Sequence, residues 1–152
     1  MRRSVLNDAL RQAAVVTFEQ LVFVLPDTPP DEAQRARPVT AVARIAFAGP
    51  AAGELQVRAC QGLLPRLAAN MLGNDLDDEG VQLDALGEIA NIICGQLFPH
   101  LDPYRAFEQR PPQVTIGDGD SALAGSELAA WVELGLESSR AEVVLWLTAG
   151  SE

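Results

Sequence analysis

Residues 128–148 read LAAWVELGLESSRAEVVLWLT, and this stretch decides the fold class. Apolar residues alternate along its first part with the period of a β-strand that has one buried face. They are Leu128, Ala130, Val132, Leu134 and Leu136. A nearly all-apolar run, 143–148, follows a polar segment, 137–142. The pattern predicts two strands joined by a hairpin turn at 137–142.

Upstream, helical and strand periodicities come in blocks. Three segments have helical periodicity, namely 4–25, a short one at 63–72, and 79–98, which ends before Pro99. Residues 39–47 and 55–59 alternate on either side of a Gly- and Pro-containing turn, 27–38 has loop composition, and another strand begins near Val114. The order is helix, two strands, two helices and three strands. It predicts one α+β domain over residues 1–152, with a mostly antiparallel sheet, two long helices and one short helix.

Composition excludes several classes of function. The chain of 152 residues has a formal net charge of −10, and all eleven of its basic residues are arginines. Such a charge argues against binding to nucleic-acid phosphates and to anionic membranes. Without lysine, the chain has neither a Schiff-base lysine nor a P-loop lysine.

The reactive residue types are also scarce. Cys60 and Cys94 lie in apolar stretches without a CxxC motif, which favours buried free thiols over a disulfide or a reactive thiol. His100 is the only histidine, so histidine-based metal sites and Ser-His-Asp triads are not expected. The acidic stretch 74–79 and the segment 117–120 are interpreted as loops rather than cation sites. No apolar run spans a bilayer and no signal-peptide core is present, so we expect a soluble, cytoplasmic protein without a metal site.

The helix at 79–98 carries two stripes. One is apolar and predicted to face the core: Leu83, Leu86, Ala90, Ile93 and Leu97. The other is predicted to face solvent: Asp84, Glu88, Asn91 and Gly95, with Gly87 at its edge. Two glycines and an asparagine within nine residues disfavour the helix, which suggests close approach or hydrogen bonding by a partner there. The alternative is a polar surface without a function.

Glu88 and Asn91 are three residues apart and therefore project side by side. A carboxylate beside a carboxamide is poorly suited to covalent catalysis. Such a pair can bind a partner's cation and orient a water molecule, as a glutamine does in GTPases.

The pattern of this helix resembles the active-site helix of the CheC/CheX/FliY chemotaxis phosphatases. The matching residues are Asp84, Glu88, Asn91, Gly95 and Leu97. The flanking sequences are similar to the CheX-like branch: Gly53-Glu54-Leu55, Ala68–Gly73 and the proline pair Pro111-Pro112 followed by Val114. The resemblance covers residues 50–118. One departure from the family's pattern is the interval from Asn91 to the proline pair. It is about one residue shorter than in the family, which bears on the placement of the 98–110 loop.

The resemblance implies an α+β fold whose catalytic helix docks on a phosphorylated, CheY-like receiver domain. It implies that Glu88 contacts a lysine of the partner and that Asn91 positions water for in-line attack on the aspartyl phosphate. Asp84, Gly87 and Gly95 would then contact the partner, which would also supply Mg²⁺. The CheX-like branch further implies a homodimer formed through sheet edges. Since Glu19 is followed three residues later by Val22, the second Glu–Asn pair of some relatives is missing, which implies one site per chain.

The sequence is compatible with three functions. The leading one is a phosphatase for the aspartyl phosphate of a receiver domain. The second is a non-catalytic adaptor of the same fold that binds a receiver domain or a motor-switch component. The third, a small-molecule sensor, predicts an apolar pocket with convergent polar groups.

Overall fold

The computed structural model describes residues 3–73, 78–118 and 125–148, which form one α+β unit as predicted. Residues 74–77 of the acidic stretch 74–79 and residues 119–120 of the segment 117–120 lie outside this part of the chain. The helices are α1 (Arg3–Val22), α2 (Glu32–Arg35), α3 (Leu64–Leu72), which follows the 3-10 turn η1 (Gln61–Leu63), and α4 (Glu79–Leu101). The strands are β1 (Val39–Ala48), β2 (Gly53–Cys60), β3 (Glu108–Gln109), β4 (Gln113–Ile116), β5 (Ser126–Leu136) and β6 (Ser139–Thr148).

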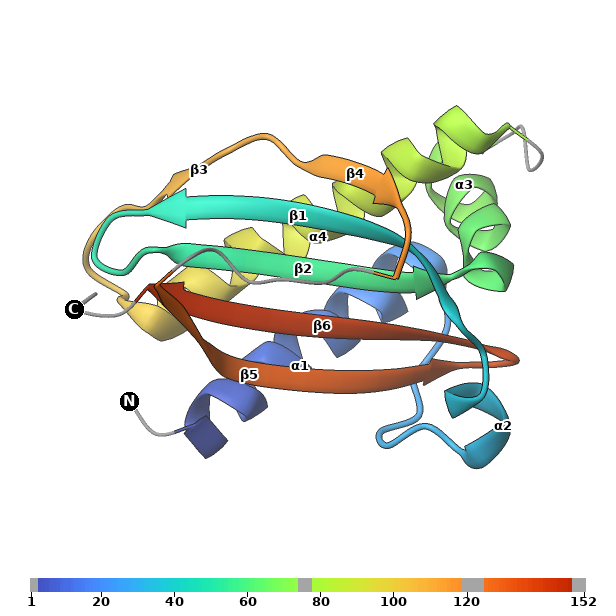
Figure 1. Ribbon diagram of the computed structural model, residues 1–152, viewed down its shortest axis with the longest axis horizontal. Coiled ribbons are helices and arrows are strands. Elements are labelled where there is room, and N and C mark those ends of the chain that lie inside the picture. Colours follow the sequence, from blue (N-terminus) through green and yellow to red (C-terminus); the bar gives the residue numbers. More distant parts are fainter. Residues whose placement is uncertain (1–2, 74–77, 119–124, 149–152) are drawn as a thin grey trace.

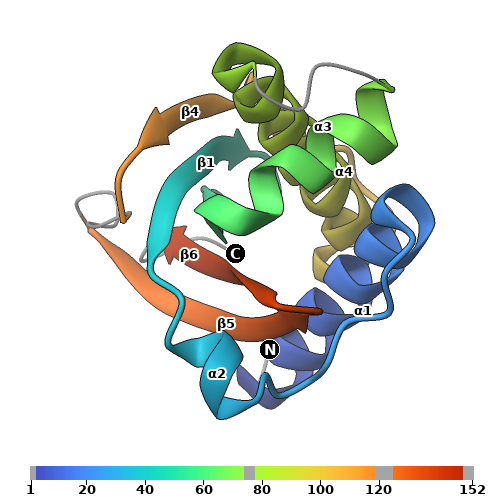
Figure 2. The same ribbon diagram turned by 90° about the vertical axis from the view of Figure 1, so that its right-hand side faces the viewer.

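The strands form one antiparallel sheet. Neighbours follow the order β3–β1–β2–β6–β5, and β4 also pairs with β1. Figures 1 and 2 show that the two long helices, α1 and α4, lie on one face of this curved sheet. The short helix α3 packs against both of them near the start of α4. The fold class predicted from the sequence is therefore confirmed.

The core lies between the sheet and the two long helices. It contains fully buried residues of α1, such as Leu10 and Phe18, and of α4. The apolar stripe predicted for α4 is confirmed, since Leu86, Ala90, Ile93 and Leu97 are fully buried and the half-buried Leu83 packs against the core. Because α4 contacts α1, α3, β1, β2 and β4, it buries a wider surface than that stripe alone. Cys60 and Cys94 are also buried free thiols, as predicted.

Three predictions near the N-terminus and the last hairpin were wrong in detail. The first helix ends at Val22 and not near residue 25, because Phe23 has a left-handed φ of 62° that stops helical hydrogen bonding. The segment 27–38 contains the one-turn helix α2, which a capping box at Asp31 stabilises. The hairpin turn between β5 and β6 is two residues long, since Leu136 pairs with Ser139.

The predictions for the segment after the site were also wrong in part. Helix α4 does not stop before Pro99 but continues to Leu101, and His100 therefore lies in its last turn. A proline so near a helix end leaves one carbonyl, that of Gly95, without its intrahelical donor. Gly95 is exposed, so water can satisfy that carbonyl. The two-residue strand β3 was not predicted at all.

A β-bulge interrupts the alternation that identified β5. The register shifts between Leu128 and Ala130, so Leu128 does not share the buried face of Ala130 and Val132. Leu128 instead lines a shallow apolar hollow with Trp131, Val144 and Trp146, on the other face of the sheet. The prediction that Leu128 alternates with the inward-facing residues was therefore wrong.

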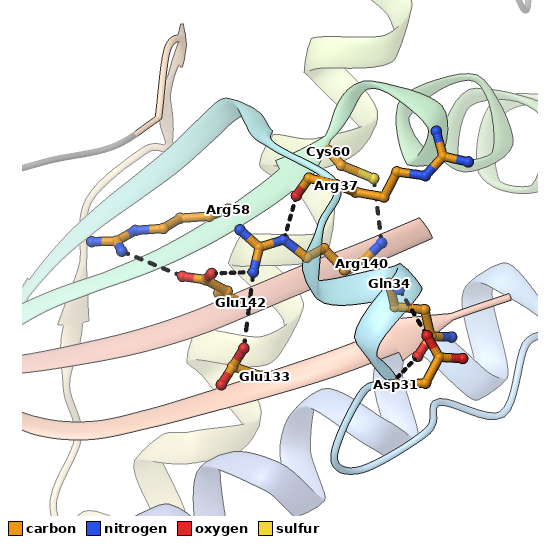
Figure 3. Close-up of polar contacts among 8 residues, drawn as sticks. All are labelled: Asp31, Gln34, Arg37, Arg58, Cys60, Glu133, Arg140 and Glu142. Atoms are coloured by element: carbon orange, nitrogen blue, oxygen red, sulfur yellow. Dashed lines mark hydrogen bonds and ion pairs between the residues drawn. The ribbon is translucent and has the colours of Figure 1, made fainter. Parts of the chain in front are cut away.

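The sheet face turned away from the helices carries a charged network (Figure 3). Glu142 forms ion pairs with Arg140, at 2.7 Å, and with Arg58, at 3.5 Å. The Nε atom of Arg140 also donates to the carbonyl of Arg37 at 2.7 Å. Glu133 of β5 also pairs with Arg140, at 3.9 Å. Two arginines and two glutamates therefore neutralise one another and join β2, β5 and β6, which gives the network a structural explanation.

Candidate functional site

The outward stripe of α4 is the surface on which the sequence places its candidate residues. Asp84, Glu88 and Gly95 are exposed, and Asn91 is half-buried. Residues three or four positions apart share one side of a helix, so this stripe forms a continuous surface. The predicted orientation toward solvent is thus confirmed, and Glu88 and Asn91 lie next to each other within one helical turn.

The site is built on a rigid element. Asp78 caps the N-terminus of α4, where its Oδ1 accepts a hydrogen bond from the backbone N–H of Val81 at 3.2 Å. Beyond this cap, the helix packs against three strands and two other helices. A helix held in this way keeps the carboxylate of Glu88 and the carboxamide of Asn91 at a constant spacing.

Gly87 has a different environment from the rest of the stripe. It is buried, and a Cβ placed on it would lie 3.1 Å from Cγ2 of Val114 and 3.3 Å from Cγ of Pro112. The glycine therefore allows β4 to pack closely on α4. This packing accounts for Gly87 within the chain itself, and a contact of Gly87 with a partner stays a prediction.

Asn91 has a polar neighbour that the sequence did not reveal. The Nε2 of Gln109 donates to Oδ1 of Asn91 at 3.0 Å and to its backbone carbonyl at 3.2 Å. Gln109 belongs to β3, 18 residues along the chain, in the segment that was interpreted as a loop. No sequence pattern marks this residue, because the contact depends on how the chain returns from the end of α4 to the edge of the sheet.

An aromatic cluster directs that return. The rings of Phe98 and Phe107 stack with their centroids 4.4 Å apart and an interplanar angle of 4°. Both rings also meet Phe47 of β1 edge to face, at centroid distances of 5.4 and 6.1 Å. The cluster ties the last turn of α4 and the segment before β3 to β1, which places Gln109 beside Asn91.

The turn between the end of α4 and Phe107 is also held by hydrogen bonds. Oδ1 of Asp102 accepts from the backbone N–H of Tyr104 at 2.9 Å, and Oδ2 accepts from Nε of Arg105 at 2.8 Å. The Tyr104 N–H, and after it the Arg105 guanidinium, lower the pKa of Asp102 below its ordinary value. Asp102 therefore accounts for the local shape of the loop beside the site.

The two carboxylates of the stripe are available to a partner. Within the described ranges, neither Asp84 nor Glu88 forms an ion pair or a side-chain hydrogen bond. Asn91 Nδ2 likewise has no hydrogen-bond acceptor among the described residues. The surface thus presents negative charge and an amide donor, which suits a cation and a polar, oxygen-rich ligand.

Thiol chemistry and metal binding have little support among the described residues. Burial raises the pKa of the Cys94 thiol to about 12, so it is not a nucleophile near neutral pH. Among the described residues, no group of three or more His, Cys, Asp and Glu side chains is arranged to hold a metal ion. No helix in the described ranges is both long and apolar enough to cross a membrane.

Comparisons with known proteins agree with this fold. The family model described as "Chemotaxis phosphatase CheX" matches residues 41–132. No curated protein sequence gives a significant match. The crystal structure of CheX from Vibrio vulnificus is similar with a TM-score of 0.76 at 17% identity, over 97% of this chain and 99% of that one. For CheX from Desulfovibrio desulfuricans the TM-score is 0.74 at 20% identity, with coverages of 93% and 98%.

A third similar structure is a complex. It is the CheX–CheY–BeF3–Mg²⁺ complex from Borrelia burgdorferi, with a TM-score of 0.68 at 19% identity, covering 93% of this chain and 96% of that one. At these identities the likeness shows a shared fold. The chain shares its α+β fold with crystal structures of CheX, CheC-like and FliY proteins. Since the family model matches more than half of it, the chain belongs to the CheX chemotaxis phosphatase family.

Proposed function

We propose that the chain is a phosphatase that hydrolyses the aspartyl phosphate of a CheY-like receiver domain. The observation that carries the proposal is the exposed Glu88 next to Asn91 on a rigid helix, in a chain of the CheX family. The similar complex from Borrelia burgdorferi, in which a CheX is bound to CheY, supports a receiver domain as the partner.

Glu88 is the anchoring group in this proposal. Its carboxylate is exposed and has no partner among the described residues, so it is free to bind a cationic side chain of the receiver. A charge-assisted hydrogen bond of this kind contributes about 1.5–3 kcal/mol. Since the whole chain carries a charge of −10, attraction to the partner depends on such local contacts and not on net charge.

Asn91 is the group that orients the nucleophile. Its carboxamide has both donor and acceptor atoms, so it can hold a water molecule in line with the acyl phosphate. The water oxygen forms a bond to phosphorus while the bond from phosphorus to the aspartate oxygen breaks. The products are inorganic phosphate and the free carboxylate of the receiver, and the water's proton leaves with phosphate or solvent.

The remaining parts of the reaction belong to the partner. The receiver supplies the acyl phosphate and the Mg²⁺ that neutralises charge on the transferred group. This assignment requires no metal ligands from this chain. The homodimer implied by the family resemblance also stays a prediction, which analytical ultracentrifugation would test.

The adaptor function differs from the phosphatase only in what happens after docking. An adaptor would use the same stripe and leave the phosphate intact. The sensor function has weaker support from the hollows among the described residues. The one lined by Leu128, Trp131, Val144, Trp146 and Arg58 has a volume of about 210 Å³, and the one on α3, lined by Pro65, Arg66, Ala69 and Asn70, about 260 Å³. Ligand sites for small molecules are usually about 300–1,000 Å³.

The decay of receiver phosphate tests the proposal. A purified receiver domain is phosphorylated, and the release of phosphate is followed with wild-type protein, Asn91→Ala, Glu88→Gln and the control Glu19→Gln. Glu19 is an exposed carboxylate on α1, so its variant removes a charge of the same kind outside the site. We expect Asn91→Ala to lower kcat by about 100-fold, because the water is no longer oriented.

The two site variants are expected to change different kinetic constants. Glu88→Gln should mainly raise KM, by about tenfold or more, because it weakens docking. Glu19→Gln should behave like wild type. A wild-type protein that binds phosphorylated receivers without accelerating decay would exclude the phosphatase and establish the adaptor.

A further inference from the structure

We propose that Gln109 is a positioning residue that holds the carboxamide of Asn91 in its working orientation. The inference rests on the proposed phosphatase function, in which Asn91 orients water. It starts from the two hydrogen bonds that Nε2 of Gln109 donates, at 3.0 Å to Oδ1 and at 3.2 Å to the backbone carbonyl of Asn91.

The backbone carbonyl determines which way both amides point. A carbonyl oxygen can only accept hydrogen bonds, so the atom of Gln109 that faces it must be the amide nitrogen. The side-chain atom of Asn91 facing the same nitrogen must then be Oδ1, because two amide nitrogens would repel each other. Nδ2 of Asn91 is consequently directed away from Gln109.

This orientation leaves useful atoms of Asn91 for a ligand. Oδ1 has two lone pairs, of which Gln109 uses one, and the other can accept a hydrogen bond from the attacking water. Nδ2 can donate to a phosphoryl oxygen. A freely rotating carboxamide would present the wrong end half of the time, whereas one fixed by Gln109 is preorganised for the reaction.

Gln109 is itself held on both sides. It pairs with Phe47 in the short ladder between β3 and β1. The backbone N–H of Arg110 donates to the carbonyl of Ala46 at 2.9 Å, and Phe107 is packed in the aromatic cluster. Its side chain therefore starts from a fixed backbone, as a positioning residue requires.

Gly95 lies next to this pair. A Cβ on Gly95 would lie 3.8 Å from Oε1 of Gln109, so a methyl group would fit and a larger side chain would approach the amide. Oε1 has no hydrogen-bond donor among the described residues. The amide oxygen of Gln109 thus lies beside Gly95 and can accept a hydrogen bond from a ligand.

Two substitutions and one matched control separate positioning from mere support of the fold. Gln109→Ala removes both hydrogen bonds, and Gln109→Glu replaces the donor by an oxygen that repels both acceptors of Asn91. Glu108→Ala, at the exposed neighbouring residue of β3, is the control. We expect kcat to fall about tenfold for Gln109→Ala, and further for Gln109→Glu, with the receiver's binding constant unchanged.

Two more readouts complete the test. The double variant Asn91→Ala/Gln109→Ala should lose no more activity than Asn91→Ala alone, because Gln109 acts through Asn91. The side-chain ¹⁵N–¹H₂ signals of Asn91 in NMR spectra should move in Gln109→Glu but not in Glu108→Ala. Unchanged kcat in both Gln109 variants, or additive losses in the double variant, would overturn the inference.

The outcomes also separate this inference from the proposed function. If wild-type protein hydrolyses receiver phosphate, Asn91→Ala does not and Gln109→Ala does so at the full rate, only the role of Gln109 is wrong. If wild-type protein has no activity, the proposed function and the role of Gln109 in it are both wrong. The NMR measurement then still shows whether Gln109 orients the Asn91 amide.

Discussion

Gly87 of α4 and Val114 of β4 are so close that a Cβ on the glycine would lie 3.1 Å from the valine Cγ2. A separation between 3.0 and 3.4 Å is tighter than nine in ten real Cβ contacts. The position next to the catalytic candidate Glu88 therefore has a glycine because of packing within the chain. At Gly95, two turns further along the same helix, a Cβ would make only an ordinary contact, 3.8 Å from Oε1 of Gln109.

Gly87→Val should destabilise the protein. The added methyl groups have to displace Val114 or Pro112, and overpacking of this kind costs about 1–3 kcal/mol. Urea unfolding measures the free energy directly, and the variant should also weaken receiver binding because β4 moves against α4. An unfolding free energy equal to that of the wild type would show that β4 can shift without a loss of stability.

Gly95→Ala should have the opposite effect on stability. Its Cβ meets nothing closer than 3.8 Å, and alanine favours a helix over glycine by up to about 1 kcal/mol. If the receiver approaches this surface closely, the same methyl group should weaken its binding severalfold. Urea unfolding and receiver titration together test the prediction, and tighter or equal binding would argue against close approach at Gly95.

The main features of the fold could be predicted because they depend on local periodicity. The buried stripe of α4, with Leu86 and Ile93, follows from a period of 3.6 residues. The two hairpins follow from strand alternation and turn composition. The exposed stripe with Glu88 and Asn91 is the reverse side of the same pattern, so the candidate site could be found as well.

The features that could not be predicted depend on distant contacts. Strand β3 is only two residues long, and it exists because Phe107 packs on Phe47 and Phe98. The contact of Gln109 with Asn91 is a consequence of that packing. The bulge before Ala130 likewise moves Leu128 to the other face without a local signal in the sequence.

The stability of the loop after α4 should depend on pH through Asp102. Since hydrogen bonds from Tyr104 and Arg105 lower the pKa of Asp102 in the folded state, the unfolded chain binds this proton more readily. The stabilisation is present above the unfolded pKa, near 4, and is lost as the pH falls through the lower folded pKa. The difference in unfolding free energy between wild type and Asp102→Asn should therefore shrink from pH 6 to pH 3. An equal difference in unfolding free energy at both pH values would show that Asp102 is not the source of the pH dependence.

The segment before β1 is attached to the β5–β6 hairpin through Gln34, which lies against Gly135. The carboxamide of Gln34 donates to Oδ2 of Asp27 at 2.9 Å and to the carbonyl of Glu137 at 2.7 Å, and it accepts from the N–H of Asp31 at 2.8 Å. A Cβ on Gly135 would overlap this carboxamide.

Gly135→Ala should therefore displace the Gln34 side chain and lose its hydrogen bonds. With about 1 kcal/mol for each of the three bonds, the variant should be about 2–3 kcal/mol less stable in urea unfolding. Gln34→Ala should cost a similar amount, because it removes the same bonds and leaves room for a methyl group. The double variant Gly135→Ala/Gln34→Ala should consequently be no less stable than Gln34→Ala, whereas additive losses would show that the two residues act independently.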